Sequence, residues 1–241
     1  MVMFLAVLPP IPILFYLFIG WANPLEALGM HHHHLHVFME STIFLLILLG
    51  CIVQFFRPKR KAAPMLQAAI AIFLMTLVAI VTSSYDIAFL FFLVPIMAAV
   101  ALHPSGFRTL FQPTGKFNLP LLALTAVAAI PLALYALEHL SLQASQIVGD
   151  DHGELNHWGV MATLSFSLIA FGLLAAFRLH GWRITAWSAS VMAFVLGLTS
   201  LAFPAQASAV SPVWGVIAII WSLAFALATQ FGDRLVSARS G

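Results

Sequence analysis

The sequence predicts an all-α, polytopic integral membrane protein with about eight transmembrane helices. Hydrophobic residues make up 62% of the 241 residues and charged residues only 7%. A water-soluble domain carries roughly 25% charged residues, so this chain cannot present a wettable exterior. The apolar residues also form segments near the roughly 20 residues that a helix needs to cross a bilayer. We therefore expect the lipid bilayer to be the principal partner.

Eight segments meet or approach the length of a spanning helix. They are residues 2–21, 37–56, 64–83, 87–103, 119–138, 158–177, 183–203 and 212–230. Three prolines in the first segment predict a kink, and Pro95 and Pro131 predict smaller interruptions in the fourth and fifth. We interpret residues 2–21 as a retained helix rather than a secretory signal, because no Lys or Arg precedes the apolar part.

The basic residues predict the orientation of these helices. If residues 57–61 are cytoplasmic, eight spans place all ten Lys and Arg on that side and seven of the eight acidic residues outside or at the outer edge. The basic residues are Arg57, Lys59, Arg60, Lys61, Arg108, Lys116, Arg178, Arg183, Arg234 and Arg239. We expect both termini in the cytoplasm and His-rich loops on the periplasmic or extracellular face of a plasma or bacterial-type inner membrane.

An offset of 121 residues suggests a tandem repeat. It superposes His36 on His157 and Arg57 on Arg178, giving two four-helix halves, residues 1–116 and 117–241. Two such halves would have the same orientation in the membrane. The alternative is coincidence, because a run of histidines matches easily and the positive-inside rule itself places Arg after each outward-to-inward span.

The first outer loop carries the strongest candidate site. Five histidines occur among residues 31–36, followed by Glu40. Neutral imidazole suits copper, zinc, iron and nickel. If the second helix extends through this run, His32, His36 and Glu40 share one face, and His33, His36 and Glu40 share another. A carboxylate in this position, about one turn below the surface, needs a partner, a proton or a cation.

The second long outer loop offers a matching set. Asp150, Glu154 and His157 share a face if the segment is one continuous helix, and His152 lies between them. Glu154 and His157 form a Glu-x-x-His unit, which ligates di-iron centres when two copies are present. Only one copy occurs here.

These residues together predict a metal centre at the outer face. The predicted ligands, direct or supporting, are His32, His33, His36, Glu40, Asp150, His152, Glu154 and His157. We expect copper first, with iron or zinc as alternatives, and haem between His36 and His157 as a further one. The other interpretations are a solvated histidine loop or adventitious metal binding.

Several functional classes are disfavoured. The scattered basic residues form no groove for nucleic acid. The spans lack ionisable residues near the midplane, which disfavours ion-coupled transport. Cys51 stands alone, so neither a disulfide nor a thiolate metal site is available. The tryptophans, among them Trp158 and Trp221, are expected in the interfacial aromatic belt.

Two functions remain in competition. The first is a metalloprotein that performs oxidative copper chemistry or electron transfer, with a zinc hydrolase using Glu40 or Glu154 as general base as its variant. The second is a non-catalytic accessory subunit that packs against other membrane subunits. Whether the chain is an enzyme stays open at this stage.

Overall fold

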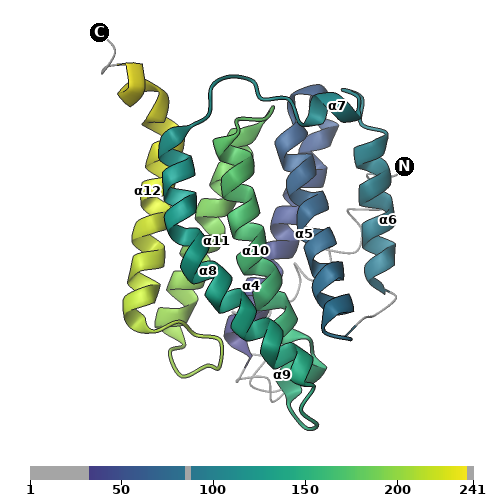
Figure 1. The fold of residues 1–241 in the computed structure, drawn as a ribbon, viewed down its shortest axis with the longest axis vertical. Helices are drawn as coiled ribbons and strands as arrows, with labels where there is room; N and C mark the ends of the chain where they lie inside the picture. The colour runs from purple at the N-terminus through teal and green to yellow at the C-terminus, as the bar shows by residue number, and fades with distance from the viewer. Residues whose placement is uncertain (1–32, 85–87, 238–241) are drawn as a thin grey trace.

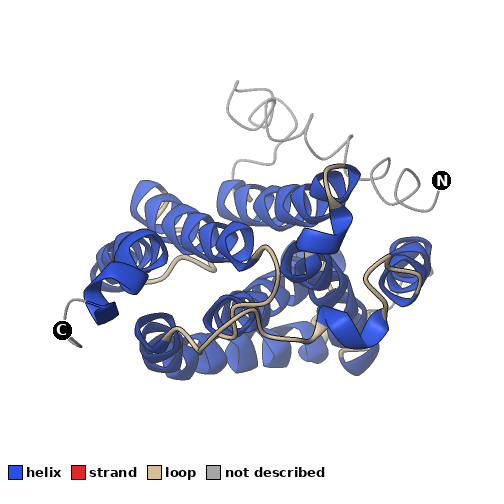
Figure 2. Cartoon of the chain, turned by 90° about the horizontal axis from the view of Figure 1, so that it is seen from above, coloured by secondary structure: helices blue, strands red, loops and turns tan. Residues whose placement is uncertain are grey.

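The computed structural model describes residues 33–84 and 88–237 as helices joined by loops, with no β-strand among them (Figures 1 and 2). The helices are α4 (His34–Ile52), α5 (Ala62–Val81), α6 (Ala88–Ala101), α7 (Phe107–Leu110), α8 (Leu119–Ser145), α9 (Asp151–Glu154), α10 (His157–Ala176), α11 (Trp182–Ala202) and α12 (Pro212–Ser237), with 3-10 turns η1 (Val53–Phe55) and η2 (Pro58–Arg60).

Six of the described helices are long and apolar enough to cross a membrane: α4 extended by η1, α5, α8, α10, α11 and α12. The chain is thus an all-α protein whose apolar helices suit contact with the lipid bilayer. The fourth expected span corresponds to α6, which has 14 residues and falls short of the roughly 20 required. The first expected span, residues 2–21, lies outside the described residues.

Two helix ends matter for the site, and one of them differs from the sequence expectation. The helix α8 continues to Ser145 instead of ending at residue 138, because the segment after Glu138 contains good helix formers and no Gly or Pro. His139 is therefore inside a helix. The helix α4 begins at His34, so the histidine run enters the helix as expected.

The helix α10 lies at the centre of the bundle and contacts α4, α5, α8 and α11. Of its spanning segment, 78% is buried, against 17% for α8 and 22% for α12, which form an outer layer. Small residues allow close packing between layers: a Cβ on Gly172 would meet Thr125 of α8, and one on Gly197 would meet the backbone of Gly215 in α12.

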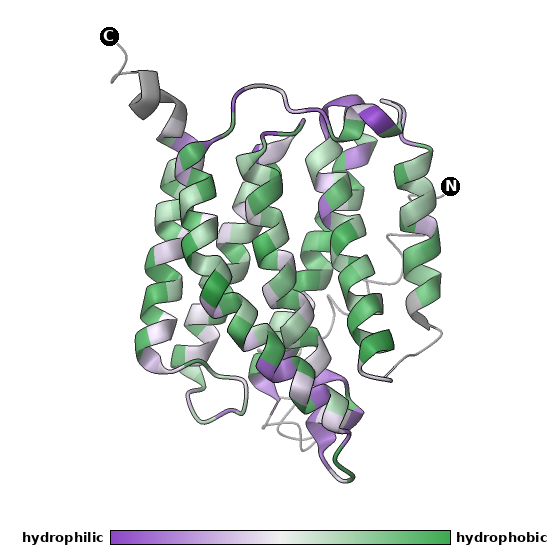
Figure 3. Cartoon of the chain, viewed as in Figure 1, coloured by the Kyte–Doolittle hydropathy of each residue, from purple (hydrophilic) through white to green (hydrophobic). Residues whose placement is uncertain are grey.

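Hydrophilic residues concentrate at the two ends of the bundle (Figure 3). The connection from α6 through α7 to α8 lies at one end, and α9 lies at the other (Figure 1). The first end carries the basic residues of the loops, including Arg57, Arg108 and Arg178. The second end carries the histidines that begin α4 and α10.

Candidate metal centre

Three histidines meet where α4 and α10 begin. His33 directly precedes α4 and His36 lies in its first turn, so the two rings are three residues apart on one side of the chain. His157 is the first residue of α10. It starts a new helix because Asn156 before it adopts a left-handed conformation, with φ of 57°.

These three rings can hold a metal ion between them. One ligand nitrogen from each of His33, His36 and His157 lies within 4.8 Å of the other two. The residues are 6%, 0% and 5% exposed, respectively. The rings of His36 and His157 stack nearly parallel, with centroids 4.8 Å apart and planes inclined by 4°.

The hydrogen bonding leaves nitrogen atoms available at this site. His36 Nε2 is hydrogen-bonded to Ser208 Oγ at 2.6 Å. The Nδ1 atoms of His36 and His157 are buried and have no hydrogen-bond partner among the described residues. Buried polar atoms are nearly always paired, and an unprotonated nitrogen of a neutral imidazole could find its partner here in a metal ion.

A network of hydrogen bonds supports the His36 ring through Ser208. Ser208 Oγ also bonds His139 Nε2 at 3.0 Å, and His139 Nδ1 contacts the carbonyl of Tyr135 at 2.8 Å. The Tyr135 hydroxyl donates to the carbonyl of Ser208 at 2.6 Å. Such supporting bonds fix the orientation and tautomer of a metal-binding imidazole.

A second group of residues covers the site from α9. The ring of His152 lies 4.6 Å from that of His33 and 5.0 Å from that of His36, and its Nε2 is buried without a hydrogen-bond partner among the described residues. The indole of Trp158 stacks on His152 at 4.8 Å and donates to Asp150 Oδ2 at 2.8 Å. His152 is thus placed to support the three-histidine group or to join it.

Asp150 is held as an anion by these contacts. Partial burial opposes ionisation of its carboxyl, but the hydrogen bonds from the Trp158 indole and the His152 backbone N–H outweigh it and keep the pKa below its usual value. Its Oδ1 also lies 3.4 Å from His152 Nδ1, which orients that ring.

The remaining predicted ligands lie elsewhere. Glu40 is half-buried one turn beyond His36 and is not part of the three-histidine group. Glu154 is exposed on α9. Asp150, Glu154 and His157 do not lie on one continuous helix, because the left-handed Asn156 separates α9 from α10. His32 lies outside the described residues.

Sequence reasoning missed three contributors: Ser208, Tyr135 and Trp158. Trp158 is 7% exposed and packed among histidines, and its indole N–H has an internal acceptor in Asp150. His139 was not missed, because its place beside Glu138 at the expected end of the fifth span suggested that it could turn toward this site. Ser208 is 172 residues from His36 and carries no local pattern.

The loop between α11 and α12 supplies Ser208 and also fixes the start of α4. Gln206 Oε1 accepts a hydrogen bond from the backbone N–H of Leu35 at 2.6 Å. A helix N-terminus has backbone donors without intrahelical partners, so this bond satisfies one of them. The loop therefore ties both the helix and its His36 side chain to α11 and α12.

Comparisons with protein-family models, curated proteins and solved structures found no match to this chain.

Proposed function

We propose that this chain is an integral membrane metalloprotein whose His33, His36 and His157 bind one transition-metal ion. The observation that carries the proposal is the convergence of three buried imidazoles with ligand atoms within 4.8 Å of one another. Three protein ligands with a position left for water or another molecule are typical of reactive metal sites.

Binding requires a small contraction of the cluster. Metal–nitrogen bonds of about 2.0–2.1 Å place two ligands of a tetrahedral ion roughly 3.4 Å apart. The present separations reach up to 4.8 Å. Small rotations of the three side chains would bring one nitrogen of each ring to the separation that a bound ion requires.

The ligand set supports copper as the first candidate metal. The group contains three imidazoles and no carboxylate, which disfavours Mg²⁺ and Ca²⁺. Among divalent first-row metals, Cu²⁺ binds nitrogen ligands most tightly, followed by Zn²⁺ and Ni²⁺, with iron weaker. Zinc and iron are the alternatives that the test below distinguishes.

The surroundings favour electron transfer or oxidative chemistry over hydrolysis. A hydrolytic zinc site uses a carboxylate base beside the metal-bound water. Asp150 is engaged by Trp158 and His152, and Glu154 is exposed. A haem between His36 and His157 is disfavoured, because the two rings lie face to face at 4.8 Å and leave no room for a porphyrin between them.

A tandem origin of the two halves would explain why His36 and His157 meet. Arg57 and Arg178, which share the 121-residue offset, both adopt left-handed conformations, with φ of 56° and 55°. The helix α5 contacts both α4 and α10, just as α11 contacts both α10 and α4. We include a 4+4 arrangement with the site on the outer face in the proposal.

Elemental analysis with an optical spectrum tests the proposal. The full chain is purified in detergent without an affinity metal column, and we expect about one equivalent of metal to survive mild chelation. The variant H157A should lose it, whereas H180A, at an exposed histidine of the opposite end, should retain it. A folded wild-type protein that binds no copper, zinc or iron even after reconstitution would contradict the proposal.

A further inference from the structure

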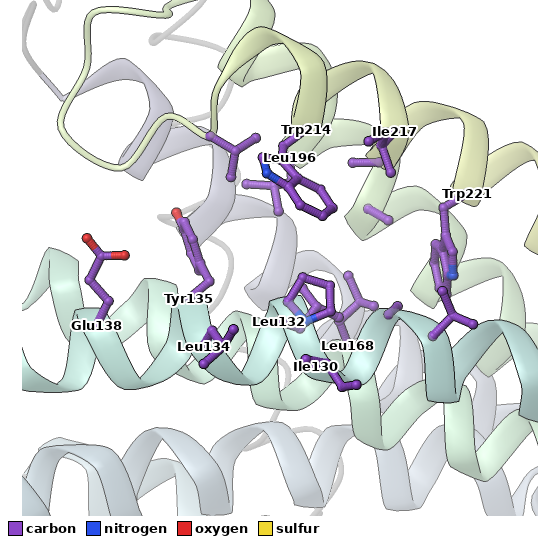
Figure 4. A pocket seen from close by; sticks show the side chains of 16 residues that line it. Ile130, Leu132, Leu134, Tyr135, Glu138, Leu168, Leu196, Trp214, Ile217 and Trp221 are labelled. Atoms are coloured by element: carbon purple, nitrogen blue, oxygen red, sulfur yellow. The ribbon is translucent and has the colours of Figure 1, made fainter.

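A cavity of about 600 Å³ lies between α8 and α12 (Figure 4), and Tyr135 of its lining bonds Ser208, which also bonds His36. Its floor is formed by Leu168 of α10 and Leu196 of α11, and its walls by apolar side chains of α8 and α12. This volume falls in the range of small-molecule sites. Tyr135 and Glu138 are the polar side chains that distinguish the cavity from a plain lipid-facing groove.

The cavity has two different ends. At one end the Trp221 indole donates to the carbonyl of Leu124 at 2.9 Å, joining α12 to α8. Trp221 lies near the middle of the α12 span, Pro212–Gly232. At the other end Tyr135 and Glu138 rise from α8 toward the loop that precedes α12 (Figure 4).

The polar end offers hydrogen-bond acceptors. The Tyr135 hydroxyl already donates its hydrogen to Ser208, so its oxygen is left as an acceptor. The Glu138 carboxylate is exposed and accepts only. Neither Lys nor Arg lines the cavity, so an anionic headgroup would meet a carboxylate without a compensating cation.

The cavity lies at membrane depth. From Val127 to Glu138 it follows about 16 Å of α8, at a rise of about 1.5 Å per residue. It is bounded by the two helices whose spans are least buried. Because hydrocarbon in the bilayer is as apolar as the lining, an acyl chain gains only packing there, and selectivity must come from the headgroup.

We propose that this cavity binds a single-chain amphiphile with an uncharged, hydrogen-bond-donating headgroup, a long-chain alcohol in chemical class. The alkyl chain lies between α8 and α12, and the head hydroxyl donates its one hydrogen to Glu138 beside Tyr135. The head then lies beside Ser208, which bonds both Tyr135 and His36. The inference goes beyond metal binding and does not require it.

Photo-crosslinking tests the site with two probes of one chain length, a diazirine-bearing alcohol and the matching carboxylic acid. The full chain in nanodiscs is labelled and mapped by mass spectrometry. The variant A128F, which fills the cavity, should reduce labelling of α8 and α12 roughly tenfold, the discrimination that misfit of a small group provides. The matched control A126F, exposed on the same helix outside the lining, should leave it unchanged.

A preference for one headgroup distinguishes a specific binding site from nonspecific contact with the surrounding lipid. The alcohol should label roughly two- to fivefold more strongly than the acid, and E138Q should remove most of that preference. Equal labelling by both probes, or full labelling of A128F, would overturn the proposal. H36Q protein without bound metal should show the same preference for the alcohol over the acid. This measurement tests the cavity independently of the metal analysis.

Discussion

His103 and His36 are both buried histidines, at opposite ends of the bundle, yet their surroundings differ in kind. His103 is 3% exposed, its Nε2 bonds Gln54 Oε1 at 3.3 Å, and its Nδ1 accepts from the Ser105 N–H at 3.3 Å. His36 is 0% exposed and bonds Ser208, but its Nδ1 has no partner among the described residues. Burial alone therefore does not distinguish the two histidines, whereas the unpaired nitrogen and the neighbouring imidazoles of His36 do.

The electrostatic settings of the two histidines differ as well. His103 lies at the end that carries Arg57, Arg108 and Arg178, where a metal cation would be repelled. Burial lowers the pKa of His103, and Gln54 is held for it by bonds to the carbonyls of Gly50 and Lys61. This arrangement stabilises a neutral structural histidine. The opposite end instead gathers imidazoles around Asp150.

Replacing His36 of the candidate metal site should have the largest effect on metal affinity. In H36Q the amide can still bond Ser208 but replaces a strong ligand with a weak one. We expect metal affinity to fall by more than about 100-fold, beyond the ~10–100-fold cost of losing a supporting contact. Isothermal titration with Cu²⁺ measures it, and an unchanged melting temperature shows that the fold is intact. Wild-type affinity in H36Q would remove His36 from the site.

Removing the Ser208 hydroxyl that bonds His36 should reduce metal affinity less than replacing His36 itself. In S208A the His36 and His139 rings lose their shared hydroxyl. We expect metal affinity to fall about 10–100-fold. The control is S211A, an exposed serine of the same loop, which should bind like wild type. Equal affinities in both variants would mean that Ser208 does not position the ligand.

Substitution of His103 at the opposite end should lower the stability of the protein and leave its metal content unchanged. H103A leaves the Gln54 carbonyl oxygen without its partner. An unsatisfied buried polar group costs about 1–3 kcal/mol, so we expect a lower melting temperature in detergent. Metal stoichiometry should equal that of wild type. Loss of metal in H103A with a retained fold would show that the two ends are not independent.

The smallest expected effect concerns pH. The folded pKa of His103 lies below its unfolded value of about 6.5, so its contribution to stability is fully present above that pH and is lost as pH falls below it. The slope cannot exceed about 1.4 kcal/mol per pH unit for one proton. Thermal melts of wild type and H103N between pH 7.5 and 5 should converge in the acid. Parallel curves would contradict a neutral buried His103.

Much of the fold could be predicted from hydropathy. Apolar segments and loop charges indicated the helices now seen as α4, α5, α8, α10, α11 and α12, with boundaries within a few residues for most of them. There are two exceptions: α12 continues to Ser237 beyond the expected end at residue 230, and α8 was ended too early because Glu138 and His139 resemble a loop start. Such a pair does not break a helix, since the exposed Glu138 side chain can lie toward water and the buried His139 ring bonds Tyr135 and Ser208 while the backbone bonds continue.

The candidate site could be predicted only in part. His33, His36 and His157 were among the expected ligands, because histidines that start two helices on one side of a membrane are confined to a thin layer. This confinement to one depth of the bilayer follows from the sequence, but it does not predict which imidazole rings come into contact.

Hydropathy and charge identify an all-α membrane protein, place the basic residues and most of the histidines at opposite ends of the helices, and point to the two chain segments that form the candidate metal site. The packing of the helices reveals that α4 and α10 begin side by side, that Asn156 separates α9 from α10, and that Ser208 reaches His36 from 172 residues along the chain. Hydropathy acts locally and sets depth in the membrane, whereas lateral packing depends on side-chain contacts between helices distant in sequence.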